Sequence, residues 1–130
     1  MAVTRPARLL TLGALLALAP ATYAADAEAG KIVFETLCAI CHSTTTEPGG
    51  PIVGPTLAGV VGRKSASVKD FPLYSDVMKA YNVTWNARTL DEFLADPTAK
   101  VPGSQMIMPV ADDKQRADLI AYLGTLKAKN

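Results

Sequence analysis

The sequence predicts an all-α protein of about four or five short helices joined by long loops. Three observations support this fold class. Apolar residues recur at helical spacing in the first and last segments beyond residue 25. Capping residues precede several of these candidate helices, and no segment shows a convincing strand pattern. The length of 130 residues favours a single domain.

Residues 1–24 have the pattern of a secretory signal peptide. Arg5 and Arg8 form a basic start, residues 9–19 are a short apolar segment, and Thr22 and Ala24 are small residues at the −3 and −1 positions of a cleavage site. A segment of about ten apolar residues is too short to span a bilayer, and the alternatives are an uncleaved anchor or a buried core helix. We expect cleavage after Ala24, export to the periplasm, no stable membrane insertion and one domain over residues 25–130.

The first helix of that domain is expected to begin at Asp26, a capping residue, and to continue through the CAICH motif at residues 38–42. Residues 43–72 are rich in Gly, Pro, Ser and Thr and show little periodicity, which predicts a loop. A loop of this length in a compact domain is unusual unless it has a function, such as wrapping a ligand.

Three more helices are expected in the second half of the chain. A short one covers residues 75–81 and ends at Asn82, which tolerates the left-handed cap conformation. The TLDE sequence at residues 89–92 has the pattern of a capping box and predicts a helix that stops before Pro97. A second loop covers residues 100–110. The last helix begins near Asp112 and has an apolar side formed by Leu119, Ile120, Tyr122, Leu123 and Leu126.

The CAICH motif contains both cysteines and the only histidine of the chain. Two cysteines two residues apart and followed at once by histidine form the attachment pattern of a c-type haem. Cys38 and Cys41 would lie on one side of a helical turn, so both sulfurs can form thioethers to the vinyl groups of one porphyrin. His42 would then be an axial iron ligand, and its other ring nitrogen would donate to a backbone carbonyl.

Three other interpretations of these residues remain open. An exported protein permits a disulfide between Cys38 and Cys41. A thioredoxin-type redox pair requires a preceding strand, whereas the preceding residues are helical in pattern. A zinc site requires a fourth ligand, and the chain has no further Cys or His.

The charge balance argues against a nucleic-acid binder. The predicted mature chain carries 11 Lys and Arg against 12 Asp and Glu, because only Arg5 and Arg8 leave with the leader. A protein that binds nucleic acid needs a clustered basic surface, and no basic run is present.

From about Gly30 to Leu126 the chain resembles a class I cytochrome c of the mitochondrial and purple-bacterial periplasmic branch. Five segments support the resemblance in the order of the family: GKIVFETLCAICH, GPTLAGVVGRK, YSDVMKAYNVTW, TLDEFLADPTAKVPGSQM and DLIAYL. The resemblance implies the class I cytochrome c fold, with loops wrapped around one haem c that Cys38 and Cys41 attach covalently.

The resemblance also implies the iron ligands and their support. Met106 falls where the family places the sixth iron ligand, opposite His42, and the carbonyl of Pro55 accepts from the imidazole. Met108 is a rival ligand only two residues away, and Met78 is a remote third option.

Further positions carry over to the rest of the haem pocket. Arg63, Tyr74, Trp85 and Ser104 stand where the family hydrogen-bonds the haem propionates, whose burial requires donors and a positive charge. Phe93 departs from the family, because many relatives have a tyrosine there that hydrogen-bonds the methionine sulfur. Gly30 and Tyr122 are expected at the crossing of the first and last helices. The pocket or that crossing is expected to contain Phe34, Leu57, Leu94 and Leu119.

The function that the resemblance implies is single-electron transfer rather than catalysis, because a six-coordinate iron leaves no site for a substrate. We expect a monomer that exchanges electrons transiently with a membrane oxidoreductase or oxidase, a dehydrogenase or a photosynthetic reaction centre. The alternatives are a dedicated electron-transfer subunit of a periplasmic complex and, if Met106 does not bind iron, a haem peroxidase or gas sensor.

The lysines that ring the exposed haem edge in the family are mostly missing. Lys31 and Lys100 are the nearest that remain. We therefore expect partner docking to depend little on electrostatic steering. Other residues occupy the family's lysine positions, namely Leu37, Thr98, Ala99 and Gln105.

Overall fold

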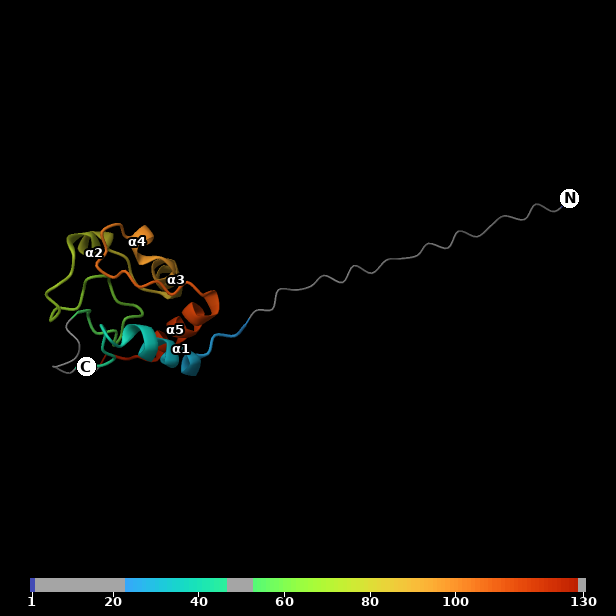
Figure 1. Cartoon of the computed structure of the whole chain (residues 1–130), viewed down its shortest axis with the longest axis horizontal. Helices are drawn as coiled ribbons and strands as arrows, with labels where there is room; N and C mark the ends of the chain where they lie inside the picture. The colour runs from blue at the N-terminus through green and yellow to red at the C-terminus, as the bar shows by residue number, and fades with distance from the viewer. Residues whose placement is uncertain (2–22, 47–52, 129–130) are drawn as a thin grey trace.

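The computed structural model describes residue 1 and residues 23–46 and 53–128. Most of the predicted signal peptide therefore lies outside the described residues, as do residues 47–52 of the first loop. Figure 1 shows a small helical body in which long loops connect the elements. These elements are α1 (Ala27–Val33), the π-helical segment η1 (Phe34–Cys38), α2 (Asp76–Tyr81), α3 (Ala87–Ala95), α4 (Pro97–Lys100) and α5 (Asp113–Thr125).

The all-α prediction is confirmed for the part of the chain that the structure describes. Its β-type pairing is limited to one isolated antiparallel bridge between Lys64 and Thr84. None of the helices in these ranges has the length and apolar character that crossing a bilayer requires.

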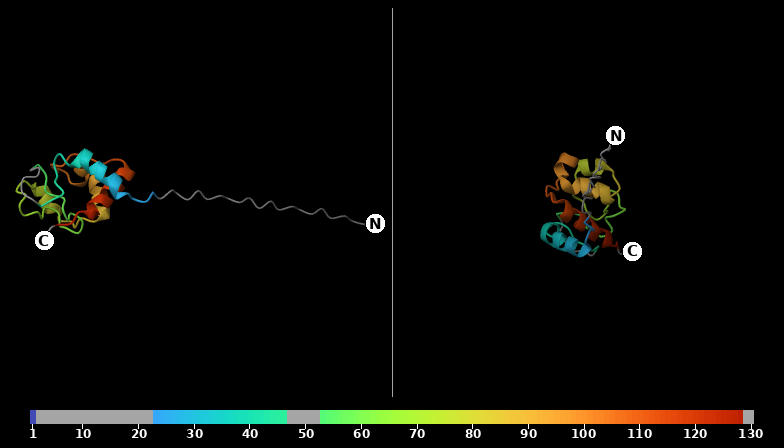
Figure 2. Two further views of the ribbon diagram at one scale, coloured as in Figure 1. Left: turned by 90° about the horizontal axis from the view of Figure 1, so that it is seen from below. Right: turned by 90° about the vertical axis from the view of Figure 1, so that its right-hand side faces the viewer.

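Helices α1 and α5 cross in close contact, as both Figure 1 and Figure 2 show. Gly30 makes the crossing possible, because a Cβ atom there would lie 1.9 Å from the carbonyl oxygen of Asp118. The amide of Asp26 donates to Oδ1 of Asp118 at 2.8 Å. The rings of Phe34 and Tyr122 pack with their centroids 5.6 Å apart. The expected roles of Gly30 and Tyr122 at this crossing agree with the structure.

The first helix does not continue as an α-helix to His42, as the sequence had suggested. It widens into a π turn at η1, where the amide of Ala39 donates to the carbonyl of Phe34 at 2.9 Å. The hydroxyl of Thr36 donates to the carbonyl of Ile32 at 2.7 Å, and such back-bonding by threonine competes with the regular helical bond. Single π turns occur frequently at functional sites.

The start of α3 differs from its prediction. Asn86 is the N-cap residue: its side chain accepts from the amide of Thr89 at 3.0 Å, and the Thr89 hydroxyl accepts from the amide of Asn86 at 2.9 Å. The capping box is thus formed by Asn86 and Thr89, and the predicted box of Thr89 with Glu92 was wrong. The helix begins at Ala87 because the extended backbone of Asn86 provides the capping geometry first.

The other capping residues agree with the sequence, with one addition and one difference. Helix α5 ends at Thr125, so Leu126, expected on the apolar side of this helix, is instead the residue that follows it. Ser75 caps α2, Asn82 ends it in the left-handed conformation, and Asp112 caps α5. Beyond the predicted stop at Pro97, the chain forms the short helix α4. Asp96 caps that helix and Pro97 occupies its first position, where the missing N–H costs nothing.

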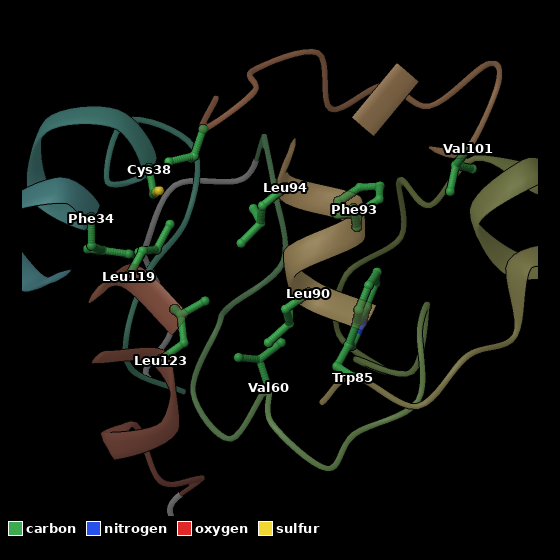
Figure 3. Close-up of a cluster of buried hydrophobic side chains, with 11 residues drawn as sticks. Phe34, Cys38, Val60, Trp85, Leu90, Phe93, Leu94, Val101, Leu119 and Leu123 are labelled. Atoms are coloured by element: carbon green, nitrogen blue, oxygen red, sulfur yellow. The ribbon is translucent and has the colours of Figure 1, made fainter. Parts of the chain in front are cut away.

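The buried core is built from η1, α3, α5 and the loops between them. Figure 3 shows side chains from these elements converging on a shared centre. The cluster includes Phe34, Cys38, Val60, Trp85, Leu90, Phe93, Leu94, Val101, Leu119 and Leu123.

Candidate functional site

A cavity of about 790 Å³ lies inside this core. Its volume is within the range of about 300–1,000 Å³ that is typical of small-molecule and cofactor sites. The structure brings all ten of the predicted site residues to its wall, although they come from segments far apart in the chain. These residues are Cys38, Cys41, His42, Pro55, Arg63, Tyr74, Trp85, Phe93, Ser104 and Met106. The expected pocket residues Leu57, Leu94 and Leu119 line the same cavity, whereas Phe34 packs at the helix crossing.

The two cysteines are held one turn apart at the end of η1. The amides of Cys41 and His42 both donate to the carbonyl of Cys38, at 3.0 and 2.9 Å. Both thiols are free, so the structure does not support a disulfide. Burial, with a smaller contribution from Cys41, raises the pKa of the Cys38 thiol to about 11.

The raised thiol pKa is also the opposite of what a thioredoxin-type redox pair requires, since reactive cysteines have lowered pKa values. The described residues contain no group of three or more Cys, His, Asp or Glu side chains placed to hold a metal ion. A zinc site at the CAICH motif therefore lacks support.

The imidazole of His42 is fixed by the loop that follows the motif. Its Nδ1 lies 2.7 Å from the carbonyl oxygen of Pro55. A carbonyl oxygen only accepts, so Nδ1 carries the proton and Nε2 keeps its lone pair. Burial lowers the pKa of His42, which favours the neutral ring that binds a metal.

Gly54 completes the seat of this imidazole and was missed by the sequence analysis. A Cβ atom at residue 54 would lie 2.5–2.9 Å from three atoms of the His42 ring. The amide of Gly54 donates to the carbonyl of Cys41 at 2.9 Å, which holds the loop against the motif. The signal in the sequence was a glycine directly before the proline that supports the ring.

Hydrogen bonds within the loop fix its backbone at Met106, the candidate iron ligand. The buried Ser104 hydroxyl donates to the carbonyl of Met106 and accepts from its amide, both at 3.2 Å. In this arrangement Ser104 directs its only proton to the methionine loop, so its contact with a propionate stays a prediction. Met106 is half-buried and packs on the core cluster, whereas 52% of Met108 is exposed. Met78, from α2, also reaches the cavity wall.

Arg116 of α5 holds the far end of this loop, and sequence reasoning missed it. Its Nη1 donates to the carbonyls of Val110 and Ala111 at 2.9 and 3.1 Å. Its Nε donates to Asp91 of α3 at 2.6 Å, and its Nη2 donates to Asp113 at 2.7 Å. The buried guanidinium thus ties the end of the methionine loop to α3 and α5.

The predicted propionate-binding residues lie at another part of the wall. Arg63 donates from Nη1 to the carbonyl of Ala58 and from Nη2 to that of Thr56, both at 2.8 Å. Two of its five N–H groups are used in this way among the described residues, which leaves three for a carboxylate. Desolvation lowers the pKa of Arg63, although a guanidinium remains charged in proteins.

Two aromatic residues accompany this arginine. Trp85 is buried and packs against Phe93 with ring centroids 5.2 Å apart. The Tyr74 hydroxyl accepts from the amide of Val68 at 3.3 Å, and burial raises the pKa of Tyr74. Both side chains keep a donor that a carboxylate inside the cavity could use.

The residues present fit a covalently attached haem. Two thiols lie one turn apart, a neutral imidazole keeps a free lone pair, and the remaining wall is mostly apolar with a charged arginine. A haem bound here supplies one-electron iron chemistry.

Comparisons with known proteins point to one family. The family model of cytochrome c matches residues 27–127. The chain is 44% identical over 110 residues to "Cytochrome c-type cyt cy" of Rhodobacter capsulatus, which covers 82% of this chain and 52% of that protein. It thus spans about half the length of that relative. It is 41% identical over 122 residues to cytochrome c2 of Rhodomicrobium vannielii, with 91% of this chain and 94% of the relative covered. Cytochrome c of Tetrahymena pyriformis is 42% identical over 99 residues, with 75% and 86% covered.

Proposed function

The chain belongs to the cytochrome c family and carries one haem c bound through Cys38 and Cys41, and from this premise we propose that it is a soluble electron carrier whose iron is ligated by His42 and Met106. The family transfers electrons and does not catalyse reactions on substrates. With a side chain on each face of the haem, the iron has no open position. Both oxidation states then keep the same ligands, so little rearranges when an electron moves.

The observation that carries this proposal is the hydrogen bond between His42 Nδ1 and the carbonyl of Pro55 at 2.7 Å. It orients the ring and raises its basicity as an iron ligand. Met106 supports the second half of the proposal, because it lines the same cavity from a loop that Ser104 and Arg116 hold in place. A thioether ligand opposite imidazole favours Fe(II) and raises the reduction potential.

Two differences favour Met106 over Met108 as the sixth ligand. The Met106 side chain is half-buried against the core, whereas more than half of Met108 faces solvent. The Ser104 hydroxyl also fixes the backbone of Met106 itself.

We further propose that the protein works in the periplasm after cleavage behind Ala24, as a single domain over residues 25–130. The pattern of the first 24 residues supports export. A monomer of this kind would exchange electrons by transient contact with a membrane oxidoreductase or oxidase, a dehydrogenase or a photosynthetic reaction centre. Such electron-transfer contacts are small and weak.

Optical spectra of the purified holoprotein in both oxidation states test the ligation. We expect a low-spin spectrum with the weak sulfur-to-iron charge-transfer band, and no rapid binding of carbon monoxide to the ferrous protein. Met106→Leu should abolish the band and admit carbon monoxide, whereas the control Met108→Leu should preserve both properties of the wild type.

Other outcomes would contradict specific parts of the proposal. Loss of the band in Met108→Leu alone would transfer the ligand role to Met108. A high-spin wild-type spectrum, or rapid carbon monoxide binding, would favour a peroxidase or gas sensor. Copurification in a stable complex would favour a dedicated electron-transfer subunit.

A further inference from the structure

The rim of the cavity is almost entirely uncharged. Some residues both line the cavity and are exposed, so they join the cavity wall to the molecular surface, and we call this set of residues the cavity mouth. Among the described residues the cavity mouth has seven members, of which five are apolar and one is a neutral amide. They are Val53, Leu73, Ile107, Met108 and Pro109, with Gln105 and the single charged residue Lys64.

The chain segments that form most of the cavity mouth also lack charge. Residues 53–62 and 101–111, which hold five of its seven members, contain no Asp, Glu, Lys or Arg. The ammonium group of Lys64 points to the side-chain oxygen of Asn82 at 3.4 Å. Charge near the opening is therefore sparse and local.

Two lysines that stand nearest to the family's ring positions are neutralised by partners. Lys31 pairs with Glu35 at 3.9 Å, and Lys100 pairs with Glu92. A paired lysine contributes little field at a distance, because the opposite charge beside it cancels most of its potential. These two lysines therefore add little net positive field that could attract an acidic partner.

Resting on the proposed electron-carrier function, we propose that the cavity mouth docks a redox protein whose own contact face is apolar and uncharged. The exposed apolar groups gain by leaving water, in proportion to the area covered. An acidic partner would lose the hydration of its carboxylates at this surface without gaining cations to pair with them. Complementarity here is therefore a match of two neutral, apolar faces.

Electron self-exchange between oxidised and reduced holoprotein tests this proposal directly. The second copy of the chain is a probe with a neutral, apolar face of its own, and NMR line broadening measures the exchange rate. We expect the rate to change less than about threefold when ionic strength rises from about 0.01 to 1 M, which shortens the Debye length from about 30 to 3 Å. Electrostatically steered associations change by factors of about 10 to 10³.

A matched pair of variants locates the docking surface. Ile107 at the cavity mouth is 68% exposed, and Ile32 on α1 is 65% exposed but does not line the cavity. Ile107→Lys places two like charges face to face in the self-exchange complex. It should slow exchange about tenfold at low ionic strength, with recovery at high ionic strength. Ile32→Lys should remain within about twofold of the wild type.

The optical spectrum separates a docking effect from a ligation effect, because it reports the iron ligands without any partner. If Ile107→Lys changes the spectrum, Leu73→Lys replaces it, since Leu73 is 55% exposed at the same mouth. A wild-type spectrum with a slow, steeply salt-dependent self-exchange would overturn the docking proposal and leave the electron-carrier function standing. Equal slowing in Ile32→Lys would overturn it as well.

A lipid surface could also cover an apolar face, and one more measurement decides between the two. Cosedimentation with neutral phosphatidylcholine vesicles is expected to be absent. If the wild type bound such vesicles and Ile107→Lys did not, the cavity mouth would be a membrane contact and the proposal would be wrong.

Discussion

Replacing Gly30 by alanine tests whether the close crossing of α1 and α5 holds the fold together. The added Cβ atom would lie 1.9 Å from the carbonyl oxygen of Asp118, 2.4 Å from its carbonyl carbon and 2.9 Å from the amide nitrogen of Leu119. All three are backbone atoms of α5, which cannot rotate away as the end of a flexible side chain can. One helix must therefore move by on the order of 1.5 Å to restore van der Waals contact.

The structure allows the size of the effect to be estimated. A shift of this kind separates the rings of Phe34 and Tyr122 and stretches the hydrogen bond from Asp26 to Asp118. Overpacking a well-packed interface costs about 1–3 kcal/mol, and a lost hydrogen bond to a charged group costs about 1.5–3 kcal/mol. Alanine regains about 1 kcal/mol of helix propensity. We expect Gly30→Ala to lower the free energy of unfolding by about 2–4 kcal/mol.

Guanidinium denaturation of the ferric holoprotein measures this difference, followed by far-UV circular dichroism and by the fluorescence of Trp85, the only tryptophan. Gly124→Ala is the matched control, because Gly124 also lies in a helix, but its added Cβ would meet nothing within 4 Å beyond its chain neighbours and the backbone of its own helix. That control should gain up to about 1 kcal/mol. If Gly30→Ala were as stable as the wild type while the control behaved as expected, the crossing would not require glycine.

Three further changes test the site and its supports. Gly54→Ala places a Cβ atom 2.5 Å from Cε1 of His42, so the ferric spectrum should gain a high-spin component, and an unchanged spectrum would contradict the steric argument. Arg116→Leu leaves two loop carbonyls without their donor, which should make it about one pH unit easier for acid to displace the proposed ligand Met106, as followed by the charge-transfer band. A hydrogen bond from the ammonium group of Lys114 holds the pKa of Asp118 below its ordinary value of 3.8. The ionised carboxylate therefore stabilises the fold fully above pH 3.8, and this contribution is lost as the pH falls through the lowered pKa of the folded state. Asp118→Asn should therefore flatten the loss of unfolding free energy below pH 3.8, and an unaltered acid profile measured by denaturation would refute that role.

The chemistry of the CAICH motif made part of the site predictable from residues alone. Covalent attachment and metal binding need particular side chains at fixed spacing, so the spacing alone predicts the roles of Cys38, Cys41 and His42. Nothing in the local sequence connects Met106 or Arg63 to that motif. The family resemblance supplied those positions, and the structure brings both to the same cavity wall.

The site residues that the sequence analysis did not predict, Gly54 and Arg116, act through contacts between segments that are distant or not obviously related in the sequence. Gly54 matters because the His42 ring lies against its backbone, and Arg116 matters because its guanidinium reaches loop carbonyls six and five residues away. The start of α3 was misplaced because Asn86 and Thr89 are both good capping residues. Their separation of three residues lets one box contain both, and only the backbone conformation decides which of them is the cap.

Several of the hydrogen bonds that fix the site share one feature, which is that backbone carbonyls accept them. His42 is held by the carbonyl of Pro55, Arg63 by those of Thr56 and Ala58, and Arg116 by those of Val110 and Ala111. The backbone course of two loops, around residues 55–58 and 110–111, therefore positions these site residues more than the side chains of the loops do. Substitutions that keep this course should be tolerated, whereas changes at its glycines and prolines move the acceptors themselves. A carrier whose iron must keep the same surroundings in both oxidation states benefits from this arrangement, because the acceptors belong to a backbone that the arrival of one electron does not need to rearrange.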